Sequence, residues 1–282
     1  MPKGDDERVQ PALHAVLTGD VDGLRAALRA DPGAVNLKVG DDTMLELMTQ
    51  PEGGPPSPEI IEVLIDAGAH LDRALNLAGC WNLADLCTQL LAAGADPAAR
   101  ADAGITPLES AAMHSSTEAA DILVAHGLHR PALWLAAAAG LLAEVQRWVG
   151  PDGSLLADPG PYRPNWTDVG RPAGSSPTGD PAEIVGEALV FAALNNRRGV
   201  VDYLLDAGAG IDSRPYQDTT ALHLAIQFQR ADMVRHLLDR GASVTIEDAN
   251  FNSDAGGWAH ACDDGSETAA SIRAMVGAAR AG

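Results

Sequence analysis

His114 and Glu109 are the side chains of this 282-residue chain that are best suited to acid–base chemistry. They stand five positions apart, and Asn195 could supply a third polar group if the fold brings the three residues into one pocket. A histidine or a carboxylate works as a general acid or base when it is held in a site that excludes water. No zinc-protease motif, nucleophile elbow or phosphate-binding loop accompanies them. Catalysis by these three residues is therefore the weaker of two hypotheses.

The three cysteines do not form the pattern of a metal or redox centre. Cys80 and Cys87 are seven positions apart, and Cys262 lies far along the chain. A structural zinc site takes two close pairs of ligands, and a disulfide framework takes an even set of cysteines. Free cysteines are more often small buried residues. We therefore expect neither a metal nor a cofactor.

The charge and hydropathy of the chain argue against two classes of ligand. The chain holds 19 basic and 39 acidic residues, a net charge of −20. A nucleic-acid groove needs a basic stripe, and an anionic membrane surface attracts basic segments, so neither partner is expected. No apolar run is long enough to span a membrane, and no signal peptide is visible at the N-terminus. The sequence predicts a cytoplasmic protein.

A repeat of 33 residues organises the elements that must position these side chains. The phrase Asp-Ala-Gly-Ala at 206–209 recurs as Asp-Arg-Gly-Ala at 239–242, and Gly94 is followed by Gly127 at the same interval. The apolar residues within 233–238 follow the spacing of one helix face. Each glycine is predicted to end a helix in the left-handed conformation, which a residue without Cβ enters at little cost.

A second type of helix, with its own start signal, precedes each of these. The phrase Thr-Pro-Leu-Glu-Ser-Ala-Ala begins at Thr106 and Thr-Ala-Leu-His-Leu-Ala begins at Thr220, each opening with a capping hydroxyl. A 33-residue period with two helices and this opening resembles the ankyrin repeat, in a divergent form similar to that of bacterial proteins. The resemblance implies an all-α solenoid of about eight helix pairs with short β-turn fingers, since each pair buries its apolar face only against its neighbours.

One long insertion interrupts the repeats. We expect a single domain over 1–282, with repeats at 8–150 and 183–280 and the insertion at 151–182. The insertion is rich in Pro and Gly and has neither a helical nor a strand period, so it is predicted to be a loop. It also holds aromatic residues, which are only 4% of the chain, so we expect it to fold against the groove. A flexible spacer is the alternative.

The resemblance also implies which residues meet a partner. Ankyrin repeats bind along a concave groove, whose positions follow the Ala-Ala pair of each first helix, and at the finger tips. Trp134, Glu109, Glu46 and Asn76 stand where the family uses a histidine, and each needs another partner. The residues predicted to line the binding surface are Trp81, Met113, His114, Trp134, Tyr162, Arg163, Trp166, Asn195, Tyr216, Gln227 and Phe228.

The sequence is compatible with two functions that belong to different classes of protein. The first is a non-enzymatic binding module that recognises a protein or peptide through the groove and the long loop. The acidic chain favours a partner of basic character. The second is a small-molecule-binding protein or atypical enzyme, in which the 151–182 loop closes a pocket that holds His114, Glu109 and Asn195. A cavity beneath the loop would favour the second.

Overall fold

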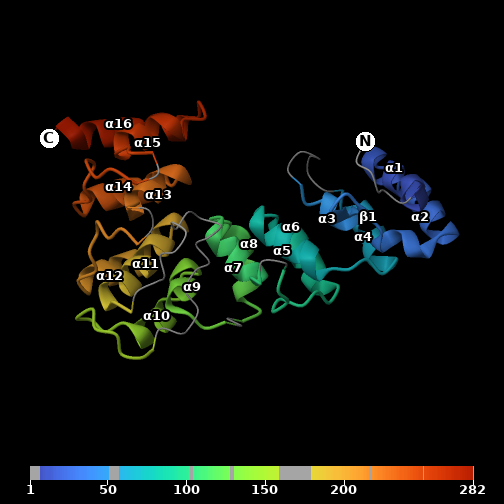
Figure 1. The fold of residues 1–282 in the computed structure, drawn as a ribbon, viewed down its shortest axis with the longest axis horizontal. Helices are drawn as coiled ribbons and strands as arrows, with labels where there is room; N and C mark the ends of the chain where they lie inside the picture. Colours follow the sequence, from blue (N-terminus) through green and yellow to red (C-terminus); the bar gives the residue numbers. More distant parts are fainter. Residues whose placement is uncertain are drawn as a thin grey trace. The chain divides into compact units, whose positions relative to one another are not determined.

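The computed structural model is shown in Figure 1 and describes residues 7–50, 57–101, 104–127, 130–158, 179–215, 218–249 and 251–281. The chain divides into two compact units, Met1–His129 and Arg130–Gly282. The α-helices of the described residues form eight pairs, four in each unit. The predicted all-α solenoid of about eight helix pairs is confirmed. The single domain over 1–282 stays a prediction.

The first unit contains four helix pairs and a short finger. The finger is an antiparallel pair of strands, β1 (Lys38–Val39) and β2 (Asp42–Thr43). First helices pack in one layer, α5 against α3 and α7, while second helices pack in another, α2 against α4 and α6 against α8. The helices are α1 (Gln10–Thr18), α2 (Val21–Ala30), α3 (Met44–Leu47), α4 (Pro58–Asp66), α5 (Asp72–Cys80), α6 (Ala84–Ala92), α7 (Pro107–Met113) and α8 (Thr117–Val124).

The second unit repeats this two-layer plan. Its first helices α9, α11, α13 and α15 pack in sequence, and its second helices pack as α10 with α12 and α14 with α16. The helices are α9 (Leu133–Ala138), α10 (Leu142–Trp148), α11 (Pro181–Leu194), α12 (Arg198–Asp206), α13 (Ala221–Gln227), α14 (Ala231–Asp239), α15 (Ala255–Ala261) and α16 (Glu267–Ala281).

The insertion joins the second unit through a turn at one end and a helix at the other. Val149 and Leu155 form an isolated antiparallel bridge. At the far end, α11 begins at Pro181, where the side chain of Asp180 accepts a hydrogen bond from the Ala182 amide at 3.0 Å. Pro181 and Ala182, which the sequence predicts to lie in the loop, are thus the first two residues of a helix. Residues 159–178 lie outside the described part of the chain.

Glycines end the second helices in the predicted way. Gly94 has φ +97° and Gly241 has φ +91°, values that strain a residue with a Cβ. After each glycine, the next amide donates to a leucine carbonyl five residues back, at 3.0 Å to Leu90 and 2.9 Å to Leu237. Both leucine side chains are completely buried, so the cap and the core are built by the same turn of helix.

Candidate protein-binding surface

Every first helix from α5 to α13 ends in the same turn. The residue after the helix end takes a left-handed conformation, with φ between 55° and 76°. The following amide then donates to a carbonyl five residues back, as from Ser116 to Ala111 at 3.0 Å. The helix ends therefore occupy equivalent places in their repeats; they are Trp81, His114, Ala139, Asn195 and Phe228.

In the first unit, two of these helix ends face solvent. Trp81 is 45% exposed, and His114 is exposed at the end of the neighbouring helix. The Nδ1 of His114 lies 2.8 Å from the carbonyl oxygen of Ser110 and donates this hydrogen bond, since a carbonyl can only accept. Met113, one position earlier, is buried. This part of the predicted groove therefore exposes one indole and one imidazole ring.

In the second unit, α11 and α13 end differently. Asn195 is completely buried, and its Nδ2 donates to the carbonyl of Phe191 at 2.9 Å. Gln227 is exposed and Phe228 is half-buried, so α13 has an accessible end where α11 has a buried one. We call Trp81, His114, Gln227 and Phe228 the helix-end residues. The predicted partner residue Tyr216 lies outside the described residues.

Glu109 and Glu46 hold the starts of their own helices. The amide of Thr106 donates to Oε2 of Glu109 at 2.7 Å, and the amide of Glu109 donates to the Thr106 hydroxyl at 3.3 Å. Glu46 pairs with Thr43 in the same reciprocal way. This capping box satisfies two amides that the helix leaves without an internal acceptor. Glu109 is buried, so its carboxylate serves the helix rather than the solvent-facing surface.

Trp134 and Asn76 stand at the position that corresponds to Glu109 in their own repeats, but they make other contacts there. The Trp134 ring is 4% exposed and packs on Phe191, with the ring centroids 4.7 Å apart. The Nδ2 of Asn76 donates to the carbonyl of Ile105 at 3.1 Å, which ties α5 to the start of the next repeat. In both cases the side chain predicted to need a new partner contributes to packing between repeats.

The three residues of the acid–base hypothesis have different surroundings. Glu109 and His114 lie on or at the end of α7 in the first unit, whereas Asn195 belongs to the second unit. Their joint role stays a prediction. Tyr162, Arg163 and Trp166 belong to the insertion that is predicted to close the pocket, and they lie outside the described residues.

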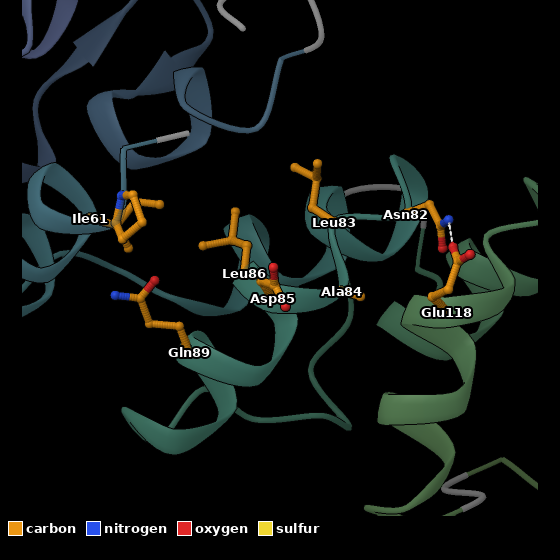
Figure 2. Close-up of a pocket in the computed structure, with 9 residues that line it drawn as sticks. Ile61, Asn82, Leu83, Ala84, Asp85, Leu86, Gln89 and Glu118 are labelled. Carbon is orange, nitrogen blue, oxygen red and sulfur yellow. Dashed lines mark hydrogen bonds between the residues drawn. The ribbon is translucent and has the colours of Figure 1, made fainter. Parts of the chain in front are cut away.

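A groove that sequence reasoning missed lies beside α6 in the first unit. Its volume is about 430 Å³. Figure 2 shows Leu86 and Gln89 of α6 pointing towards Ile61 of α4, while Asn82 hydrogen-bonds to Glu118 on the other side. The lining residues are Pro58, Ile61, Asn82, Leu83, Ala84, Asp85, Leu86, Gln89 and Glu118. The available sequence signal was the absence of Lys and Arg from α4, α6 and α8.

Comparison with known proteins identifies the repeats. A family model for ankyrin repeats (3 copies) matches residues 179–248, which hold α11 to α14. The chain is an ankyrin-repeat protein. Ankyrin repeats generally mediate interactions between proteins. The helix-end residues Gln227 and Phe228 lie within the matched ankyrin repeats, and Trp81 and His114 end equivalent helices in the first unit.

Two known proteins are similar to this ankyrin-repeat chain. The E3 ubiquitin-protein ligase KEG of Arabidopsis thaliana is 27% identical over 289 residues, which cover 85% of this chain and 17% of that protein. The chain thus spans less than a fifth of that relative's length. The crystal structure of the human ASB11 ankyrin repeat domain aligns with a TM-score of 0.45 and 18% identity, covering 94% of this chain and 97% of that chain.

Burial and hydrogen bonding each shift the pKa values of some titratable groups in these ankyrin repeats. Burial raises the pKa of the Cys87 thiol to about 12, so the group stays protonated and unreactive at neutral pH. Hydrogen bonding to Asp42 raises the pKa of Arg73, which pairs with Asp42 and Glu46 at 2.6 Å each. No group of three His, Cys, Asp or Glu side chains within the described ranges is arranged to hold a metal ion. None of the described helices is both long and apolar enough to cross a lipid bilayer.

Proposed function

We propose that this chain is a binding module that recognises a protein or peptide partner with its helix-end residues. The observation that carries the proposal is the 45% exposure of Trp81 at the end of a buried helix. The chain contains only 4% aromatic residues, and among the tryptophans that the structure describes Trp81 alone is exposed. Tryptophan is also among the residues that most often dominate the energy of a protein interface.

The charge of the chain supports a basic partner. At −20, the protein attracts Lys- and Arg-rich segments over about a Debye length, roughly 8 Å at physiological salt. We therefore expect the association rate to fall as salt rises. Tyr162, Arg163 and Trp166 of the insertion belong to the same proposal, because aromatic and guanidinium groups are typical interface anchors.

Photo-crosslinking tests the proposed surface. A photoreactive benzoylphenylalanine replaces Trp81 in one variant and Phe228 in another, and Arg235 serves as the control site. Arg235 is an exposed residue of α14, a second helix of the same repeat as Phe228. We expect protein adducts from positions 81 and 228 in extracts of the source cells and none from position 235.

The proposal also predicts the effect of removing the indole. Trp81→Ala should weaken binding of the crosslinked partner by about 1–3 kcal/mol if the ring is a buried anchor in the complex. Unchanged affinity, measured by calorimetry with the purified partner, would show that binding occurs elsewhere on the chain. A circular dichroism spectrum identical to that of the unmodified protein provides the folding control.

A further inference from the structure

The groove beside α6 combines an apolar floor with an acidic rim. Ile61 of α4 and Leu86 of α6 are only 2% and 3% exposed, so they form the floor. Asp85 and Glu118 are exposed and line the rim, and Gln89 adds an amide that can bond to a peptide backbone. A volume of about 430 Å³ is of the size that accepts a few side chains.

The helices around the groove carry one sign of charge. Within their bounds, α4, α6 and α8 hold six carboxylates and no Lys, Arg or His. Helix stability explains only part of this pattern, because an acid favours the first turn of a helix and is unfavourable near the last. Asp66 is the final residue of α4, and Asp121 lies in the middle of α8. The carboxylates, all exposed, are Glu59, Glu62, Asp66, Asp85, Glu118 and Asp121.

The second helices of the other unit show that this pattern is not a property of the repeat. There α10, α12 and α14 each include an arginine. Arg240, which follows α14, lies 2.8 Å from Asp202 and 2.6 Å from Asp206 of α12, and Arg147 lies 3.2 Å from Glu144 within α10. The second unit thus balances the carboxylates of its second helices with its own cations, whereas α4, α6 and α8 supply none.

We propose that the groove between α4 and α6 docks a segment of a partner protein that has an apolar side chain flanked by Lys or Arg. The apolar side chain packs on Ile61 and Leu86, and the cations pair with Asp85 and Glu118. The argument rests on charge complementarity, since the groove has an apolar floor and the charged residues along its lining in the described part of the chain, Asp85 and Glu118, are both acidic. The groove shares no residue with the helix-end residues, so it is a second docking surface and does not depend on the first.

Peptide selection tests the proposal without knowledge of the partner. The probe is a phage library of random linear peptides, selected on the full chain at low salt and eluted at higher salt. We expect the enriched peptides to share one Leu, Ile, Met or Phe next to Lys or Arg. Enrichment of acidic peptides, or no enrichment at all, would overturn the proposal.

Variants of the groove then show where the enriched peptide binds. Asp85→Asn should weaken its binding about fivefold, and Asp85→Lys tenfold or more, roughly the effect of losing and reversing one exposed charge. Gln89→Trp should block the groove and remove binding, with circular dichroism to confirm folding. Fluorescence anisotropy with the labelled peptide measures all three affinities.

The matched control is Asp232→Asn. Asp232 is the second residue of α14, as Asp85 is of α6, and each lies nine residues before its capping glycine. Both are exposed, so the two substitutions change the net charge and the helix terminus alike. Equal weakening by both would mean that the peptide reads only overall charge, which overturns the proposal. Peptides that respond to Trp81→Ala but not to Asp85→Asn would overturn it too, while supporting the helix-end surface.

Discussion

The two units join their repeats with different side chains at the same place. The hydroxyl of Ser116 in the first unit donates to the carbonyl of Cys80 at 2.7 Å, and Nε of Arg230 in the second donates to the carbonyl of Leu194 at 3.3 Å. Each carbonyl lies in the last turn of a first helix, where no internal amide reaches it. The repeat therefore fixes the position of the acceptor and leaves the choice of donor open.

The starts of the first helices show the same freedom. In the first unit the Thr106 amide donates to a carboxylate oxygen of Glu109, and in the second the Thr220 amide donates to Nδ1 of His223 at 3.1 Å. Both side chains are buried, yet one is acidic and the other basic. The difference teaches that a helix start capped in this way needs an acceptor rather than a particular residue, whereas the starts of the helices with Trp134 and Asn76 have no side-chain cap. Substitutions at matched positions can test that conclusion.

The largest effect is expected where the two units are identical. Leu90→Ala and Leu237→Ala should each lower the free energy of unfolding by about 2–5 kcal/mol, because each removes a fully buried side chain that precedes a capping glycine. Chemical denaturation measures the loss, and hydrogen exchange shows which unit is affected. A loss below about 0.5 kcal/mol at either position would contradict the repeat register.

A smaller effect is expected at the helix start. Glu109→Ala should cost about 0.5–2 kcal/mol, since it leaves the Thr106 amide without its acceptor. Glu109→His should cost less than Glu109→Ala, because an imidazole fills this place in the second unit. Thermal denaturation of the two variants side by side gives the ranking. If histidine proved as costly as alanine, the two caps would not be interchangeable.

The bonds between repeats are expected to contribute less. Ser116→Ala and Arg230→Ala should each lower the free energy of unfolding by about 0.5–1.5 kcal/mol, the net value of one hydrogen bond. Arg230→Ala should lie at the upper end, because the arginine stem also covers apolar surface. Urea denaturation at equal protein concentration measures both. If only one of the two variants lost stability, the joint in the other unit would be stabilised by other contacts.

The smallest effect is expected from pH, and it should distinguish the His223 cap in the second unit from the Glu109 cap in the first. Burial lowers the pKa of His223 from its ordinary value of 6.5, opposed in part by the charge of Asp248. Below pH 6.5 the unfolded chain then binds a proton at this residue more readily than the folded chain, so stability falls as pH falls. Protection of the α13 amides, calculated after correction for the slower intrinsic exchange at lower pH, should fall on mild acidification, and His223→Gln should reduce that response. An unchanged response in the variant would assign the effect to another group.

The elements could be predicted from sequence because their signals are local. A glycine that must adopt positive φ, as at Gly94 and Gly241, is visible as a residue type at a fixed interval. The start of α11 was equally visible, since Asp180 followed by Pro181 is a helix-start signal. The Pro and Gly residues around this signal dominate the stretch and make it resemble a continuous loop.

The exposure of side chains could not be predicted in this way. Trp81 and Trp134 are the same residue type in two first-helix phrases, yet one is exposed and the other is covered by Phe191, which lies 57 positions later than Trp134. The groove has the same origin, since Ile61 and Leu86 approach each other only when two second helices are placed in a layer. Such features depend on tertiary packing, and for the groove only the lack of Lys and Arg in the flanking helices is visible in the sequence.

The hydrogen bond between the repeats of α9 and α11 has a consequence for how this chain can gain or lose sequence during evolution. Ser116 and Arg230 each bond to a carbonyl 36 positions earlier, but Nε of Arg197 reaches the carbonyl of Ala138, 59 positions earlier, at 3.0 Å. The same atom of the same residue type makes the bond in the two arginine joints. Added gene sequence between two repeats thus leaves their junction unaltered, and whole repeats could be duplicated or lost as cassettes.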